Sequence, residues 1–81
     1  MNSKRRAKIQ EAVQNIYDAN LVLAECWDEE TEAYDKLPEG IRDSERGERM
    51  EGYAEALDDA IDAIQDTIDS LVEQLDLDWI S

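Results

Sequence analysis

Carboxylate side chains dominate the chemistry of this sequence, and in the C-terminal half they recur at a regular spacing. Between Glu45 and Asp76, steps of three and four residues place them along one face of a predicted helix. We call the following residues the acidic stripe: Glu48, Glu55, Asp59, Asp62, Asp66, Asp69 and Glu73. No Lys or Arg follows Arg49, so no basic side chain of the same segment neutralises the row. Such a row can attract a basic protein surface over long distances.

The acidic stripe has two interpretations. In the first it is a solvated face that keeps the chain in solution. In the second it attracts a basic groove, including one that normally holds nucleic acid, and therefore imitates a phosphate track. Like charges four residues apart cost about 0.2–0.5 kcal/mol per pair in a helix, so the row destabilises its helix by roughly 1–3 kcal/mol. That cost favours the functional interpretation but does not exclude the first.

Composition limits the partners further. The chain has 22 acidic and 8 basic residues and a formal charge of −14. Phosphate repulsion disfavours direct binding to nucleic acid or to an anionic membrane surface. No apolar run approaches the ~20 residues of a membrane span. Cys26 is the single cysteine, which fits a reducing compartment. We expect a cytoplasmic protein whose partners carry basic surfaces.

The sequence has few residues of the types that perform catalysis or bind metal ions. There is no His, so neither a His-based acid–base pair nor a His metal ligand is available. Cys26 has no His to activate it and is interpreted as a small packing residue. The glycines at 40, 47 and 52 form no phosphate-binding loop. We therefore expect no enzyme, no cofactor and no metal site.

Two long helices must position the acidic stripe. The first is predicted over about residues 4–35 and the second over about residues 44–77. In both, apolar residues recur at alternating steps of three and four, which is the heptad pattern of helices packed along a seam. Cys26 lies in a row of small residues beside the first seam, with Ala12, Ala19 and Ala33. The whole chain, residues 1–81, is predicted to form one helical-hairpin domain.

The connection, about residues 36–43, predicts how the two helices are arranged. Pro38 stops the first helix, and Gly40 gives the backbone freedom to reverse. Leu37 and Ile41 are expected to cover this end of the helix pair. A loop this short makes the helices antiparallel neighbours. The basic N-terminal cluster then lies beside the acidic C-terminal end; the residues concerned are Lys4, Arg5, Arg6 and Lys8 on one side and Glu73, Asp76 and Asp78 on the other.

The apolar faces are wider than one partner helix can cover, which predicts self-association. We expect an all-α antiparallel hairpin that dimerises into a four-helix bundle. The residues selected for self-association are Ile9, Val13, Ile16, Asn20, Leu23, Trp27, Leu57, Ile61, Ile64, Ile68 and Leu71. Asn20 is predicted to fix the register by pairing with its equivalent or with a neighbour. Trp79 and Ile80 either close the end of the bundle or project as an anchor.

The region around the turn contains residues 28–39, DEETEAYDKLPE, and residues 43–48, DSERGE, and an acidic heptad helix follows them. In these segments the chain resembles small, mostly uncharacterised acidic proteins of bacteriophages and prophages. It implies a phage-derived cytoplasmic helical hairpin and carries over no catalytic residue. Phages also encode small acidic inhibitors that imitate DNA, a likeness of class without matching residues.

These observations favour a non-enzymatic interaction protein. Our first hypothesis is a phage-type inhibitor or sequestering protein that binds a host protein, including by nucleic-acid mimicry. The alternative is a structural self-assembly module without a host target. Polar substitutions in the seam would break such an assembly, whereas charge reversal on the acidic stripe would leave it intact.

Overall fold

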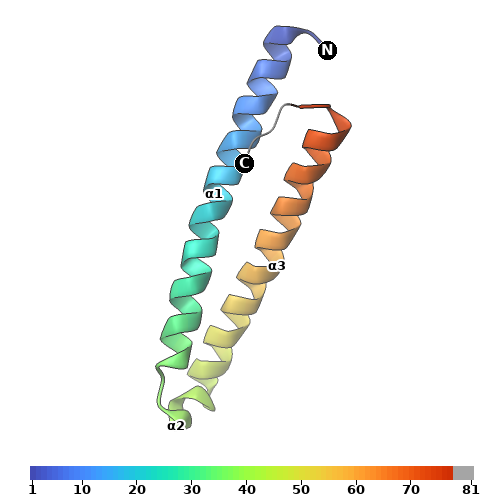
Figure 1. Ribbon diagram of the computed structural model, residues 1–81. Helices are drawn as coiled ribbons and strands as arrows, with labels where there is room; N and C mark the ends of the chain where they lie inside the picture. Colours follow the sequence, from blue (N-terminus) through green and yellow to red (C-terminus); the bar gives the residue numbers. More distant parts are fainter. Residues whose placement is uncertain (78–81) are drawn as a thin grey trace.

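The computed structural model describes residues 1–77 and contains three helices. They are α1 (Ser3–Asp35), α2 (Glu39–Arg42) and α3 (Glu45–Gln74). The two long helices, α1 and α3, pack side by side in opposite directions, and α2 lies in the connection at one end (Figure 1). The molecule measures 59 × 16 × 15 Å. The predicted all-α antiparallel hairpin is confirmed. No helix among the described residues is long and apolar enough to cross a bilayer.

The first helix begins at Ser3, close to the predicted start near residue 4, and Asn2 is its N-cap. The side-chain oxygen of Asn2 accepts a hydrogen bond from the Arg5 backbone N–H at 2.8 Å, which satisfies one of the free donors of the first turn. Along α1 the buried residues are Val13 and Asn20, seven residues apart. The heptad spacing therefore directs one narrow seam of α1 toward α3.

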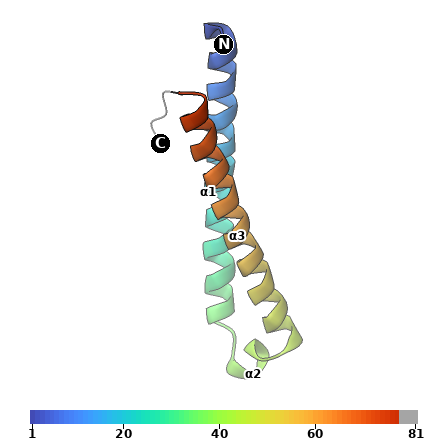
Figure 2. The same cartoon turned by 90° about the vertical axis from the view of Figure 1, so that its right-hand side faces the viewer.

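The apolar core lies in the half of the hairpin that holds the chain ends. Val13, Ile68 and Leu77 are buried there, with relative exposures of 1%, 0% and 7%. The half-buried residues packed against them are Ile9, Tyr17, Ile64, Leu71, Val72 and Leu75. Toward the turn the only buried apolar side chain among the described residues is Ala54. Figure 2 shows that α3 crosses α1 at a shallow inclination.

The turn is more ordered than a simple reversal. After Pro38, α2 forms one helical turn, closed by hydrogen bonds from the Ile41 and Arg42 N–H groups to the Pro38 carbonyl, both at 2.9 Å. The side chain of Arg42 then reaches back and donates to the carbonyl of Asp35 at 2.9 Å. This contact caps the C-terminal end of α1. Leu37 is half-buried, whereas Ile41 is 39% exposed, so Ile41 covers the helix end only in part.

Gly47 allows this turn to close. A Cβ atom at this position would lie 2.0 Å from the carbonyl oxygen of Arg42, far inside van der Waals contact. Gly47 is buried and sits in the first turn of α3. Its hydrogen atom lets α3 begin directly against the backbone of α2.

The second long helix, α3, ends at Gln74, three residues before the predicted end near residue 77. Asp76 takes a positive φ of 56°, which leaves the helical conformation. The Leu77 N–H then bonds to the Val72 carbonyl at 3.0 Å and the Asp76 N–H to the Glu73 carbonyl at 3.4 Å. This is a Schellman cap with Asp in the position usually held by Gly. It turns Leu77 back onto the core.

The basic N-terminal cluster contacts the C-terminal end of α3 differently from the prediction. The guanidinium of Arg6 donates to the carbonyl oxygens of Leu75 and Asp76, both at 2.9 Å. In residues 1–77, none of the four basic N-terminal side chains forms an ion pair with an acid of α3. A charged donor satisfies the free carbonyls at the C-terminal end of a helix and offsets the negative end of the helix dipole. This contact takes the place of the expected ion pairs between the basic cluster and the carboxylates.

Candidate protein-binding surface

The acidic stripe lies on the exposed side of α3. Every one of its seven residues is solvent-exposed. The stripe spans about 38 Å of α3, and from Glu55 to Glu73 its carboxylates follow one another at roughly 4.5–6 Å along the helix axis. This separation is somewhat larger than the 3.4 Å rise between successive phosphates of one DNA strand. The fold therefore presents an extended row of negative charge to solvent, with one wider gap of about 10 Å between Glu48 and Glu55.

Little on the molecule neutralises this row. The ion pair of α3 in the described part joins Arg49 to Glu45 at 3.6 Å, in the first turn. Farther along, Asp69 accepts a hydrogen bond from the amide of Gln65 at 3.0 Å, which is an uncharged donor. No basic side chain pairs with the acids between Glu51 and Asp76 in the part of the chain that the structure describes. The negative charge is thus available to a partner.

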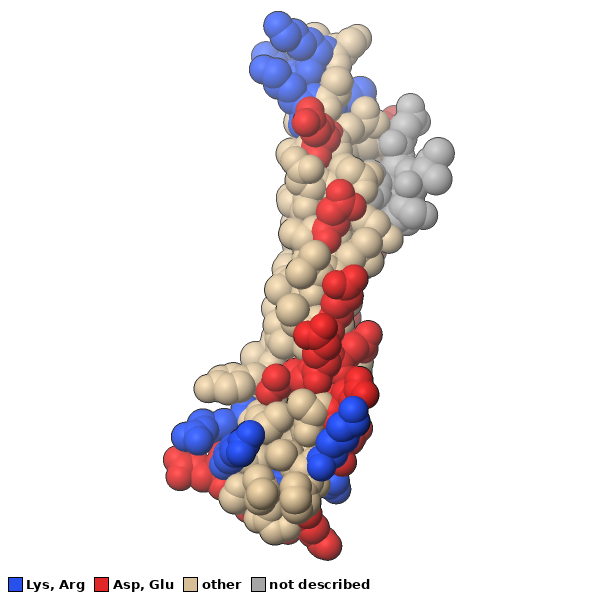
Figure 3. Space-filling model, turned by 90° about the vertical axis from the view of Figure 1, so that its left-hand side faces the viewer, with Lys and Arg blue, Asp and Glu red and all other residues tan. Residues whose placement is uncertain are grey.

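A second row of acids, which the sequence analysis did not single out, runs along α1. Glu11, Asp18, Glu25 and Glu32 recur every seven residues and are all exposed. Figure 3 faces the outer side of α1 and shows acidic side chains in an oblique row, with a band of uncharged side chains beside them. The seven-residue interval is visible in the sequence and could have identified this row. It is diluted by the apolar side chains of Leu21 and Val22, which are also exposed.

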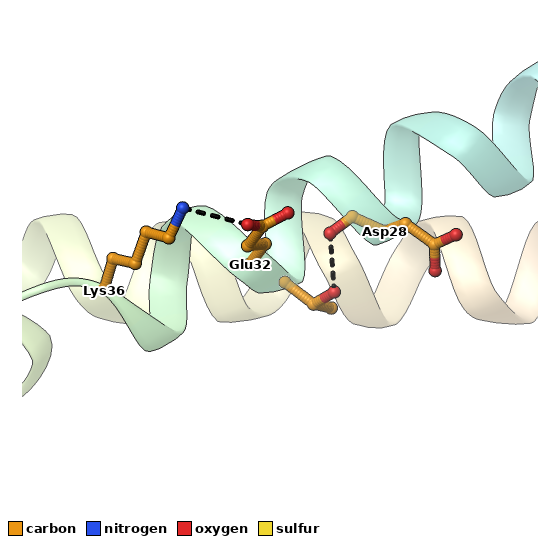
Figure 4. Close-up of polar contacts among 4 residues, drawn as sticks. Asp28, Glu32 and Lys36 are labelled. Atoms are coloured by element: carbon orange, nitrogen blue, oxygen red, sulfur yellow. Dashed lines mark hydrogen bonds and ion pairs between the residues drawn. The ribbon is translucent and has the colours of Figure 1, made fainter.

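The acids nearest the turn are partly engaged. Lys36 pairs with Glu32 at 2.9 Å, one helical turn apart (Figure 4). The hydroxyl of Thr31 donates to the Asp28 carbonyl at 3.0 Å in the same region. Because both members of the Lys36–Glu32 pair are largely exposed, the pair contributes little to stability. Residues 28–36 still carry five acids against one base, so this end of α1 stays more acidic than the middle of the same helix.

Tyr34 and Glu51 connect the two long helices near the turn. The Tyr34 hydroxyl donates to the Glu51 carboxylate at 3.4 Å, and the guanidinium of Arg42 lies 5.7 Å from the centre of the Tyr34 ring. Desolvation raises the pKa of Tyr34, the Glu51 carboxylate raises it further, and Arg42 opposes both. The cluster fixes the turn and holds Glu51 at the inner edge of the acidic side.

The residues selected for self-association are mostly used within one chain. Val13 and Ile68 are fully buried between α1 and α3. The half-buried members of the set are Ile9, Leu23, Trp27, Leu57, Ile61, Ile64 and Leu71. Ile16 is the exception, with 39% of its surface exposed. The seam thus brings these residues together inside the hairpin, and most of them are not free to meet another molecule.

Asn20 is placed in the middle of this seam. It is 6% exposed, and its side-chain amide donates to the Ile61 carbonyl of α3 at 3.1 Å. Its side-chain oxygen, Oδ1, is buried without a partner in the described structure. Asn20 therefore fixes the register of α1 against α3 through the backbone of a neighbouring helix.

No group of three or more His, Cys, Asp or Glu side chains among the described residues is arranged to hold a metal ion. Cys26 is exposed. A surface depression of about 240 Å³ lies among Asn2, Lys4, Arg5 and Lys8, away from the acidic stripe. Trp79 and Ile80, the predicted anchor, lie outside the described residues.

No protein-family model, curated protein or solved structure matches this chain significantly.

Proposed function

We propose that this chain is a non-enzymatic acidic interaction protein that binds a basic surface of a host protein through the acidic stripe of α3. In the setting that the phage resemblance implies, it acts in the cytoplasm of a bacterial host as an inhibitor or sequestering protein. It occupies a groove that otherwise holds nucleic acid. The carboxylates take the place of phosphates, and the long-range field accelerates association.

One observation carries this proposal. The stripe is exposed over about 38 Å and, among the described residues, is not paired with basic side chains along its length. A surface selected only for solubility mixes charges of both signs, because alternating signs avoid the repulsion between like charges on one helix. A single-sign row has that cost without a structural return, whereas a basic partner would offset it.

Charge reversal tests the proposal. The variant Asp62→Lys, Asp66→Lys and Asp69→Lys is compared with the wild type in a pull-down from bacterial lysate at low and at physiological salt. Partner capture should be lost in the variant, and wild-type capture should weaken as salt rises. A matched control reverses Glu11, Asp18 and Glu25 on α1, which changes the net charge equally but leaves the stripe intact. Equal loss in both variants would assign binding to net charge instead of to the stripe.

A structural self-assembly role is the second candidate, and a different observation favours it. The chain exposes 5998 Å². Folded monomers of 9.3 kDa expose about 5000 Å², so this hairpin has an excess of about 1000 Å². A standard protein interface covers about 800 Å² on each partner. We therefore propose that two hairpins associate into a four-helix bundle, which is compatible with partner binding through the acidic stripe.

A further inference from the structure

The hairpin has two broad sides that differ in charge. In an antiparallel helix pair, residues that directly precede the seam residues lie on one side of the seam in both helices, and those that directly follow lie on the other. In α3 the followers of Ala54, Ile61 and Ile68 are the acids Glu55, Asp62 and Asp69. The acids of α3 thus gather toward one side of the hairpin.

The opposite side carries no charged residue over most of its length. Its members, which we call the uncharged face, are Ala12, Asn15, Ala19, Val22 and Cys26 on α1 and Tyr53, Ala56, Ala60, Ala63 and Thr67 on α3. All of them are exposed. Val22 and Tyr53 expose 55% and 61% of their surfaces. The face is therefore a mostly apolar surface without a partner in the single chain.

The two halves of this face are level with each other. On α1 it runs from residue 12 to residue 26, centred on Ala19, and on α3 from 53 to 67, centred on Ala60. The hydrogen bond between Asn20 and the Ile61 carbonyl places these two centres side by side. The face therefore extends equally far on either side of its centre. A surface that packs against the same surface of a second copy, related by a two-fold axis, needs this property.

We propose that the uncharged face is the surface through which two copies of this chain associate, an inference that rests on the self-association proposed above. The whole elongated chain exposes about 1000 Å² more than a globular monomer of its mass, which is enough area for one subunit's share of a standard interface. Alanines on both helices let a second pair of helices approach closely. A basic partner does not fit here, because its cations would be desolvated without counter-charges.

This arrangement separates the two surfaces of the molecule. With the uncharged faces together, the acids that follow the seam in α3 point away from the contact. The acidic stripe then stays available to a basic partner in the dimer. Salt should act oppositely on the two contacts, strengthening the dimer by screening the repulsion between two chains of charge −14 and weakening partner binding.

Substitutions of both signs at the centre of the face test the proposal. The variants are Ala60→Glu and Ala60→Lys, with the same pair at Ala19, and the readout is the molar mass by multi-angle light scattering. Both signs should weaken dimerisation about tenfold or more, because either charge would be buried without a partner. The wild type should approach twice 9.3 kDa and the variants should approach 9.3 kDa. Leu21→Glu and Leu21→Lys, on the opposite side, are the controls and should keep the wild-type mass.

Comparing the Lys and Glu variants shows whether burial of a charge or the net charge of the chain governs dimerisation. If Lys strengthened the dimer while Glu weakened it, net charge would govern association and the proposal would be wrong. A wild type that stays monomeric at all concentrations and salt levels would also overturn it. Circular dichroism should show that each variant remains helical, because the substituted positions are exposed. Partner capture by the Ala60 variants should persist, so failure here is distinguishable from failure of the acidic stripe.

Discussion

The two ends of the hairpin are held by different means. At the end with the chain termini, Val13, Ile68 and Leu77 form a small buried apolar cluster. At the turn end no large apolar side chain is fully buried among the described residues, and the chain is fixed by backbone fit at Gly47 and by the side chain of Arg42. Stability therefore comes from burial at one end and from geometry at the other.

Both ends of the hairpin share one kind of contact, an arginine side chain that donates to backbone carbonyls at the end of a long helix. At the turn, Arg42 donates to the Asp35 carbonyl at the end of α1, and at the other end Arg6 donates to the carbonyl of Leu75, the C-cap residue of α3. Each long helix thus has an arginine from another element at its C-terminal carbonyls. The comparison shows how a chain with few buried residues fixes the length and overlap of two helices.

The largest expected effect is at the apolar end. Ile68→Ala removes the most deeply buried side chain of α3 and should lower the free energy of unfolding by about 3–4 kcal/mol. Urea unfolding followed by circular dichroism, at one fixed protein concentration, measures the change. The matched control is Ile61→Ala at a half-buried position of the same seam, which should cost less. Equal losses would contradict a core concentrated at this end.

A pair of glycine substitutions examines the turn end. Gly47→Ala should destabilise the protein by about 2–3 kcal/mol, because the new Cβ would overlap the Arg42 carbonyl. Gly52→Ala in the same helix meets no atom within 4 Å and should stabilise it by about 0.5–1 kcal/mol. Thermal unfolding of both variants gives opposite shifts if backbone fit holds the turn. Stabilisation by both would show that the turn has room.

A smaller gain is expected at the C-terminal cap of α3. Asp76→Gly should raise the free energy of unfolding by about 0.5–1 kcal/mol, because glycine takes a positive φ without steric cost. The control is Asp66→Gly in the helix interior, where glycine should be destabilising. A loss at both positions would argue against the Schellman cap.

The smallest effect is electrostatic. Glu51→Gln should lower the raised pKa of Tyr34 toward its ordinary value near 10, but only in part, since desolvation is the larger cause. The raised pKa stabilises the folded state below the unfolded pKa, and this contribution is lost as pH rises through the folded pKa. Ultraviolet titration of tyrosine ionisation at alkaline pH, in variants that keep Tyr34 alone among the tyrosines, measures the shift. An unchanged pKa would remove Glu51 from the cause.

Heptad spacing was sufficient to predict the two long helices and the exposed acids, because apolar periodicity determines which face is buried. The short connection predicted their antiparallel packing. The details at the ends were not predictable in this way. Gly47 gives no sequence signal for its close approach to Arg42, and Asp76 does not have the usual residue type of a left-handed cap. Both depend on where the packed helices bring the backbone.

The candidate surfaces also differ in how far the sequence predicts them. The acidic row of α3 follows directly from spacing, whereas the uncharged face appears only when the two helices are set side by side. Asn20 was expected to pair with a neighbour or with its equivalent in a second chain, and the structure supplies a neighbour, the Ile61 carbonyl. Sequence spacing could not choose between these two partners of Asn20. Every residue carries a backbone carbonyl, so no residue type marks the one that accepts the hydrogen bond.

The salt dependence of partner binding tests most directly whether the acidic stripe is a binding surface. The measurement is the dissociation constant for the captured basic partner at low and at physiological ionic strength. If the carboxylates of α3 make the contact, affinity should fall about tenfold or more over this range, with most of the change in the association rate. An affinity that stays constant across the same range would contradict the role assigned to the stripe.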